Sequence, residues 1–83
     1  MFTAILSRSA EREFARLPKK EKRKIVRKLK VLQKEPHLGK KLSGQLKGFW
    51  SYRAWPYRII YELYQGKKLV IIHKIAHRQK AYK

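Results

Sequence analysis

The spacing of apolar residues changes at Gly48, and this change limits the folds that the chain can adopt. Before Gly48, apolar residues recur every three or four positions in two successive stretches, which is the period of an amphipathic helix. After it, β-branched and aromatic residues alternate with other residues in three runs, which is the period of β-strands. The sequence therefore predicts an α+β protein with a helical first half and a β-rich second half.

Two helices are expected in the first half, after a short apolar strand at residues 2–6. The first helix carries Ala10, Phe14 and Leu17 on one face, and Pro18 ends it. The second covers residues 19–34, where one apolar stripe is surrounded by lysine and arginine. Two consecutive helices joined at a proline predict a helical hairpin.

The second half predicts an antiparallel meander of three strands. The strands cover residues 49–54, 57–64 and 69–75, with turns at Trp55-Pro56 and at Gln65-Gly66. The expected order is β-α-α-β-β-β within a single domain, residues 1–83, with the helical hairpin packed on a twisted antiparallel sheet. The other face of the sheet stays open. Two segments are expected to lie outside these elements, a loop at 37–47 and a basic tail at 76–83.

The charge of the chain predicts a polyanionic partner. Lysine and arginine number 23 against five acidic residues, so the formal net charge is +18. Cysteine is absent, which excludes disulfides and zinc fingers. No apolar run approaches the roughly 20 residues that span a bilayer, and the amino terminus lacks a basic secretory start. We expect a cytoplasmic protein without membrane contact.

Three segments resemble the RelE/ParE toxin superfamily. They are a leucine-glycine loop at 42–46 (LSGQL), an aromatic strand pair at 49–61 (FWSYRAWPYRIIY) and an ending at 75–82 (IAHRQKAY). The resemblance covers nearly the whole chain and implies a microbial RNase-like fold. For the RelE branch it implies the toxin of a type II toxin–antitoxin system, which enters the ribosome and cuts bound messenger RNA through its own 2′-hydroxyl. It also implies a cognate acidic antitoxin, no cofactor and a monomeric free toxin.

The resemblance also implies roles for individual residues. Arg58 matches the phosphate-stabilising arginine of the family, and a planar guanidinium suits a crowded phosphate. Arg78 has the same implied role, and Arg53 on the aromatic strand is assigned to the same site. Tyr82 resembles the tyrosine that stacks on a substrate base. His77 is the expected proton acceptor or donor.

One departure from the family pattern concerns the general base. RelE-type members carry lysines on the second strand, where this chain has Phe49 and Ser51. Lys47, just before that strand, is the alternative to His77. His73 alternates with isoleucines and is therefore expected to point toward the core.

Lysines of the second helix are expected to contact ribosomal RNA through its phosphates, as is Lys47. The helical lysines assigned to this role are Lys20, Lys24 and Lys28. No metal site is expected, because the chain has no aspartate and its glutamates are scattered. Two alternatives remain open: a DNA gyrase inhibitor of the ParE branch and a non-catalytic RNA-binding relative. The terminal His77, Arg78 and Tyr82 favour the nuclease.

Overall fold

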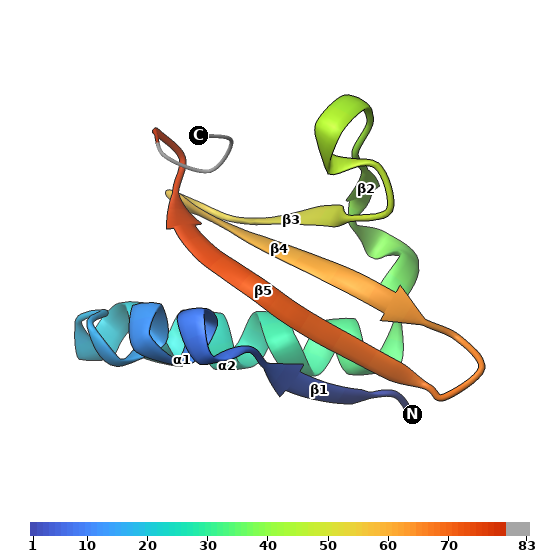
Figure 1. Ribbon diagram of the computed structural model, residues 1–83. Helices are drawn as coiled ribbons and strands as arrows, with labels where there is room; N and C mark the ends of the chain where they lie inside the picture. Colours follow the sequence, from blue (N-terminus) through green and yellow to red (C-terminus); the bar gives the residue numbers. More distant parts are fainter. Residues whose placement is uncertain (80–83) are drawn as a thin grey trace.

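The computed structural model describes residues 1–79 and shows two α-helices packed against one face of a five-stranded sheet (Figure 1). The helices are α1 (Arg8–Ala15) and α2 (Lys19–Lys34). The strands are β1 (Thr3–Leu6), β2 (Lys40–Lys41), β3 (Trp50–Ala54), β4 (Tyr57–Tyr64) and β5 (Leu69–His77). The α+β class and the predicted order of the main elements are confirmed.

The sheet is mixed, although the meander β3–β4–β5 is antiparallel as expected. Its strand order is β1-β5-β4-β3-β2, and β1 pairs with β5 in the parallel direction. The parallel pair arises because the chain leaves β1 through two helices and returns to the far side of the sheet before it builds the meander. Only such a long connection permits parallel neighbours. The sequence had suggested a purely antiparallel sheet. This expectation was wrong, because β1 joins the sheet in the parallel direction.

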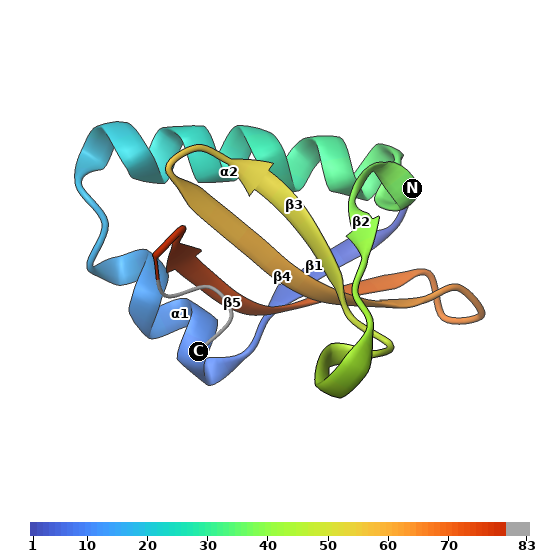
Figure 2. The same ribbon diagram turned by 90° about the horizontal axis from the view of Figure 1, so that it is seen from above.

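Apolar side chains of the helices and the sheet meet in one core. Ala10, Ile25 and Leu32 on the helices are fully buried, as are Ile59 and Ile72 on the sheet. Figure 2 shows α2 running along one side of the sheet while α1 lies at the end of β5. Both predicted helical stripes are thus covered by the sheet, and burial of apolar area is the main stabilising term.

Ser7 begins α1 and also ties it to the sheet. Its Oγ accepts from Ala10 N at 3.1 Å, the usual arrangement of a serine N-cap. The same hydroxyl donates to the main-chain carbonyl of His73 at 3.3 Å. One side chain therefore fixes both the start of the helix and the local path of β5.

The segment predicted as a loop contains two 3₁₀ helices, η1 (Pro36–Leu38) and η2 (Gly44–Leu46), with β2 between them. The buried Tyr61 holds it in place, since its hydroxyl donates to Pro36 O at 2.6 Å and accepts from Gly39 N at 3.2 Å. Burial raises the pKa of Tyr61 to about 12. A β-carbon on Gly39 would lie 2.5 Å from that hydroxyl, so glycine is required there by close approach.

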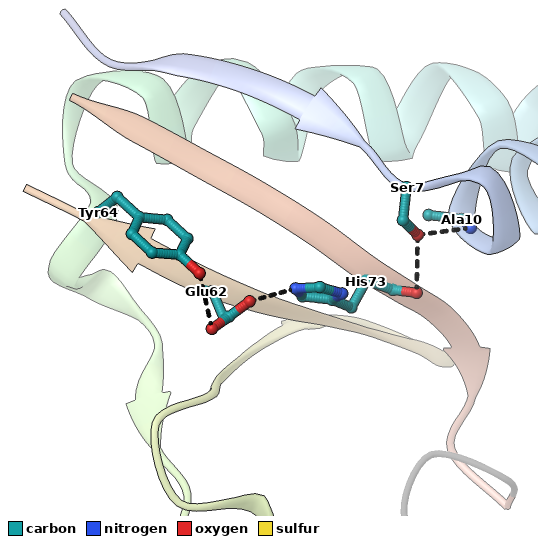
Figure 3. A network of polar contacts seen from close by, with 5 residues as sticks. All are labelled: Ser7, Ala10, Glu62, Tyr64 and His73. Carbon is teal, nitrogen blue, oxygen red and sulfur yellow. Dashed lines mark hydrogen bonds and ion pairs between the residues drawn. The ribbon is translucent and has the colours of Figure 1, made fainter. Parts of the chain in front are cut away.

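A β-bulge interrupts the pairing of β4 with β5. Ile60 pairs with Lys74 but Tyr61 pairs with Ile72, which leaves His73 without an opposite residue. The extra residue changes which face the side chains occupy. His73 accordingly shares the face of Glu62, away from the helices (Figure 3). The expectation that His73 points into the core was wrong, because the bulge breaks the alternation on which it rested.

Candidate functional site

The sheet face opposite the helices presents two arginines side by side. Arg53 on β3 and Arg58 on β4 are directly paired, and residues paired in this way project to the same face. Their β-carbons are separated by only about 5 Å. Arg53 is exposed and Arg58 is half-buried.

Placing like charges opposite one another on a sheet is unfavourable. The pair therefore contributes little to folding through its own electrostatics, whereas two guanidinium groups together suit an oxyanion such as phosphate. A hollow of about 430 Å³ lies beside the pair. Its other lining residues come from β3 and from the segment around β2: Leu38, Lys40, Ser51 and Tyr52.

Of the other residues assigned to the site, His77 and Arg78 lie away from the paired arginines. His77 pairs with Tyr57, which faces the helices, and the two rings meet edge to face with centroids 5.7 Å apart. Arg78 lies just beyond β5, where its main-chain N–H donates to Pro56 O at 2.7 Å. Its guanidinium covers the exposed ring of Trp55 at 5.0 Å. Neither side chain joins Arg53 and Arg58 in this conformation, and Tyr82 lies outside the described residues.

The lysines of α2 divide into two groups. Lys24 donates to Trp55 O at 2.5 Å, and Lys28 lies over the ring of Tyr52 at 5.6 Å from its centroid. Both are partly buried against the sheet. Lys20, in contrast, is exposed in the first turn of the helix and faces solvent.

Lys47 lies in the segment between η2 and β3. It helps to line a second hollow of about 540 Å³, together with residues of β2, β3 and the connecting segment: Lys41, Leu42, Ser43, Gly48, Phe49 and Trp50. Lys41 lies over the ring of Trp50 at 5.5 Å. The two residues of β2, Lys40 and Lys41, line one hollow each, so cationic side chains border both hollows.

His73, Glu62 and Tyr64 form a polar cluster that the sequence did not predict (Figure 3). Alternation along β4 places Glu62 on the same face as Arg58. His73 Nε2 and Glu62 Oε1 are 2.6 Å apart, with side-chain exposures of 35% and 29%. Tyr64 donates to the other oxygen of Glu62 at 3.1 Å, and this hydrogen bond raises the pKa of Tyr64. The ring of Phe49 meets His73 edge to face at 5.1 Å. Glu62 follows Arg58 by four residues on β4, and alternation along a strand puts residues an even number apart on one face. This was the signal in the sequence that Glu62 shares a face with Arg58.

Within residues 1–79, no three histidine or glutamate side chains converge as ligands for a metal ion. None of the helices there combines the length and apolar character needed to cross a membrane.

The chain matches the family described as "ParE toxin of type II toxin-antitoxin system, parDE" over residues 4–82. A two-helix layer on a mixed sheet, with an arginine-bearing open face, is thus the fold of a type II toxin. The chain belongs to the ParE toxin family, within the RelE/ParE superfamily. No curated protein sequence matches it.

Solved structures of related toxins have the same fold. The RelBE2 toxin–antitoxin complex from Mycobacterium tuberculosis contains a chain with 29% identity and a TM-score of 0.87, over 93% of this chain and 98% of that one. The E. coli RelBE complex contains a chain with 15% identity and a TM-score of 0.78, over 93% of this chain and 96% of that one. The YoeB–YefM complex from Staphylococcus aureus contains a chain with 21% identity and a TM-score of 0.76, over 93% of this chain and 97% of that one. The RelE-like fold expected from the sequence is confirmed.

Proposed function

We propose that this toxin is a ribosome-dependent endoribonuclease that cuts messenger RNA in the decoding site and so stops translation. The observation that carries the proposal is the paired Arg53 and Arg58 on the open sheet face, beside a hollow. An RNA phosphate neutralises the repulsion between the two guanidinium groups. Charge that develops on that phosphate during cleavage is then met by donors already in place.

The proposed reaction is attack of the 2′-hydroxyl on the adjacent phosphorus, which leaves a 2′,3′-cyclic phosphate and a 5′-hydroxyl. It requires cations at the phosphate and groups that transfer protons, and both kinds of group are present on the open face. It requires no metal ion or cofactor from the protein. Detection of 5′-phosphate and 3′-hydroxyl ends would contradict this chemistry.

A cognate antitoxin is part of the proposal. The structures of RelBE2, RelBE and YoeB–YefM are toxin–antitoxin complexes. A chain with a net charge of +18 needs a partner that offers negative charge, and an acidic segment that folds on binding provides it. We further propose that the toxin acts in the cytoplasm, where its ribosomal target lies, and that the free toxin is monomeric.

The test is message cleavage on programmed ribosomes with Arg58→Ala. We expect at least about a 100-fold loss of cleavage, the usual effect of removing one preorganised contact to developing charge. Arg12→Ala, which changes an exposed arginine of α1, is the matched control and should cleave normally. Circular dichroism should show that both variants are folded. Normal cleavage by Arg58→Ala would refute the assignment of the site.

Inhibition of DNA gyrase is the second candidate function. The family description names the parDE system, and Phe49 and Ser51 stand where RelE-type members carry lysines. A supercoiling assay with purified gyrase separates the two candidates. Inhibition of supercoiling together with intact message on ribosomes would favour the gyrase inhibitor.

A further inference from the structure

We propose that His73 is the proton acceptor of the cleavage reaction and that Glu62 is its positioning residue. This inference rests on the proposed nuclease function and adds to it a base other than His77 and Lys47. Its structural basis is the one histidine–carboxylate contact within residues 1–79, the pair shown in Figure 3.

The hydrogen bond fixes which ring nitrogen of His73 is available. Nε2 lies 2.6 Å from Oε1 of Glu62, and a carboxylate accepts, so Nε2 carries the proton of the neutral ring. Nδ1 is then the nitrogen that can take a proton. Among the described residues, no hydrogen bond to Nδ1 is found. A base held by a carboxylate through its other nitrogen is a common arrangement for proton transfer.

The bulge brings this imidazole onto the same face as the arginines. Arg58 pairs with Ala76 and Ile60 with Lys74, so His73 lies about two to three residues along the sheet from Arg58 and one strand across. At about 3.3 Å per residue and about 4.8 Å between strands, their α-carbons are roughly 9 Å apart. An arginine side chain, a phosphate and an imidazole together fill such a gap. Without the bulge, alternation along β5 would not put His73 and Ala76 on one face.

The surroundings of His73 keep it oriented and reachable. Its ring is 35% exposed, Phe49 contacts it from one side, and Ser7 holds its main-chain carbonyl. The titratable and charged groups that share the open face with His73 are Arg53 on β3, Arg58, Glu62 and Tyr64 on β4, and Lys74 on β5. Lys47 lies near Phe49, and the carboxylate of Glu13 on α1 accepts from Ile75 N at 2.8 Å.

In the proposed reaction, His73 takes up one proton and later releases it. The 2′-oxygen bonds to phosphorus as its proton passes to Nδ1 of His73. The bond from phosphorus to the 5′-oxygen breaks, and that oxygen keeps the electron pair and takes a proton from water. The hydroxide that remains is neutralised by the proton on the imidazolium, which returns His73 to its neutral form. The products are the cyclic phosphate and the 5′-hydroxyl.

The test compares His73→Ala and Glu62→Gln with His37→Ala on programmed ribosomes between pH 6 and 8. General base catalysis contributes about 100-fold or more, so we expect a loss of that size for His73→Ala and a smaller loss for Glu62→Gln. The rising limb of the pH–rate profile should disappear in His73→Ala, and added imidazole should restore part of the rate. His37 lies outside this face, bonded to Gln65, and its variant should behave as wild type.

Several outcomes would overturn the inference. If His73→Ala keeps the wild-type rate and profile while Arg58→Ala is inactive, the nuclease stands and another group is the base. A changed profile only in His77→Ala would transfer the role to His77. If the wild-type protein does not cleave message at all, both the nuclease and this inference fail. His73→Asn, which keeps a polar side chain at the bulge, serves as a second variant in case the alanine form does not fold.

Discussion

The two faces of the sheet differ in what their side chains contribute. The face under the helices is apolar, and its buried polar group, the hydroxyl of Tyr61, has both a donor and an acceptor as partners. The opposite face holds two arginines side by side and a half-exposed histidine–glutamate pair. The first arrangement lowers the free energy of folding, whereas the second places two like charges opposite one another, which is unfavourable on a sheet. This difference supports the proposal that the open face carries the function.

The largest expected effect is the loss of stability when a buried side chain under the helices is shortened. It should affect folding and not cleavage, which distinguishes this face from the open one. Ile25 is fully buried on α2, so Ile25→Ala should lower the free energy of unfolding by about 3 kcal/mol. Urea denaturation measures this change. Cleavage per folded molecule should stay close to wild type, in contrast to Arg58→Ala. If Ile25→Ala removed activity from the folded fraction, the separation of the faces would fail.

A second test concerns the polar group under the helices. Tyr61→Phe leaves Pro36 O and Gly39 N without their partner and should cost about 2 kcal/mol in the free energy of unfolding. A cost near zero would mean that water replaces the hydroxyl.

The same residue predicts a pH dependence. Burial raises the pKa of Tyr61 to about 12 in the folded protein, above the ordinary value of 10.0. The folded state therefore holds this proton more tightly than the unfolded state. The stability that it contributes is complete below pH 10 and is lost as the pH rises toward 12. Wild type should lose more stability than Tyr61→Phe over this range, as measured by urea denaturation at each pH.

The contrast extends to the two groups of lysines on α2. Lys20→Ala should reduce the slope of log binding constant against log salt by about one, if this exposed lysine contacts a ribosomal phosphate. Lys24→Ala should leave the slope nearly unchanged and instead lower the melting temperature, because Lys24 donates to Trp55 O. Filter binding to ribosomes at several salt concentrations measures the slope. Equal slopes for Lys20→Ala and Lys24→Ala would contradict the division of these lysines into two groups.

The smallest expected effect tests the repulsion between the arginines. Arg53→Ala should raise the free energy of unfolding by a few tenths of a kcal/mol at low salt, within the range of about 0.2–1 kcal/mol for cross-strand pairs. The gain should shrink as salt screens the charges. Arg12→Ala is the control for loss of a cation from the surface. A clear loss of stability in Arg53→Ala would show that this arginine serves the fold.

Much of the candidate site could be predicted from the sequence by local rules. Period-two alternation placed Arg58 and Glu62 on one face, and the short turn at Trp55-Pro56 sets the pairing of Arg53 with Arg58. The position of the His73 side chain could not be predicted in this way. Whether a strand contains a bulge depends on how it pairs with a neighbour distant in the sequence, and the alternation within β5 gives no sign of it.

The sequence by itself determined the element order, the apolar helix stripes and the charge, because periodicity and composition are properties of each segment alone. Only the tertiary structure decided that β1 pairs in parallel with β5, that Lys24 and Lys28 lie against the sheet, and that His77 faces the helices while His73 meets Glu62. These features depend on the register between segments far apart in the chain. A shift of one residue reverses the face of every side chain, so contacts between elements, and not local preference, decide them.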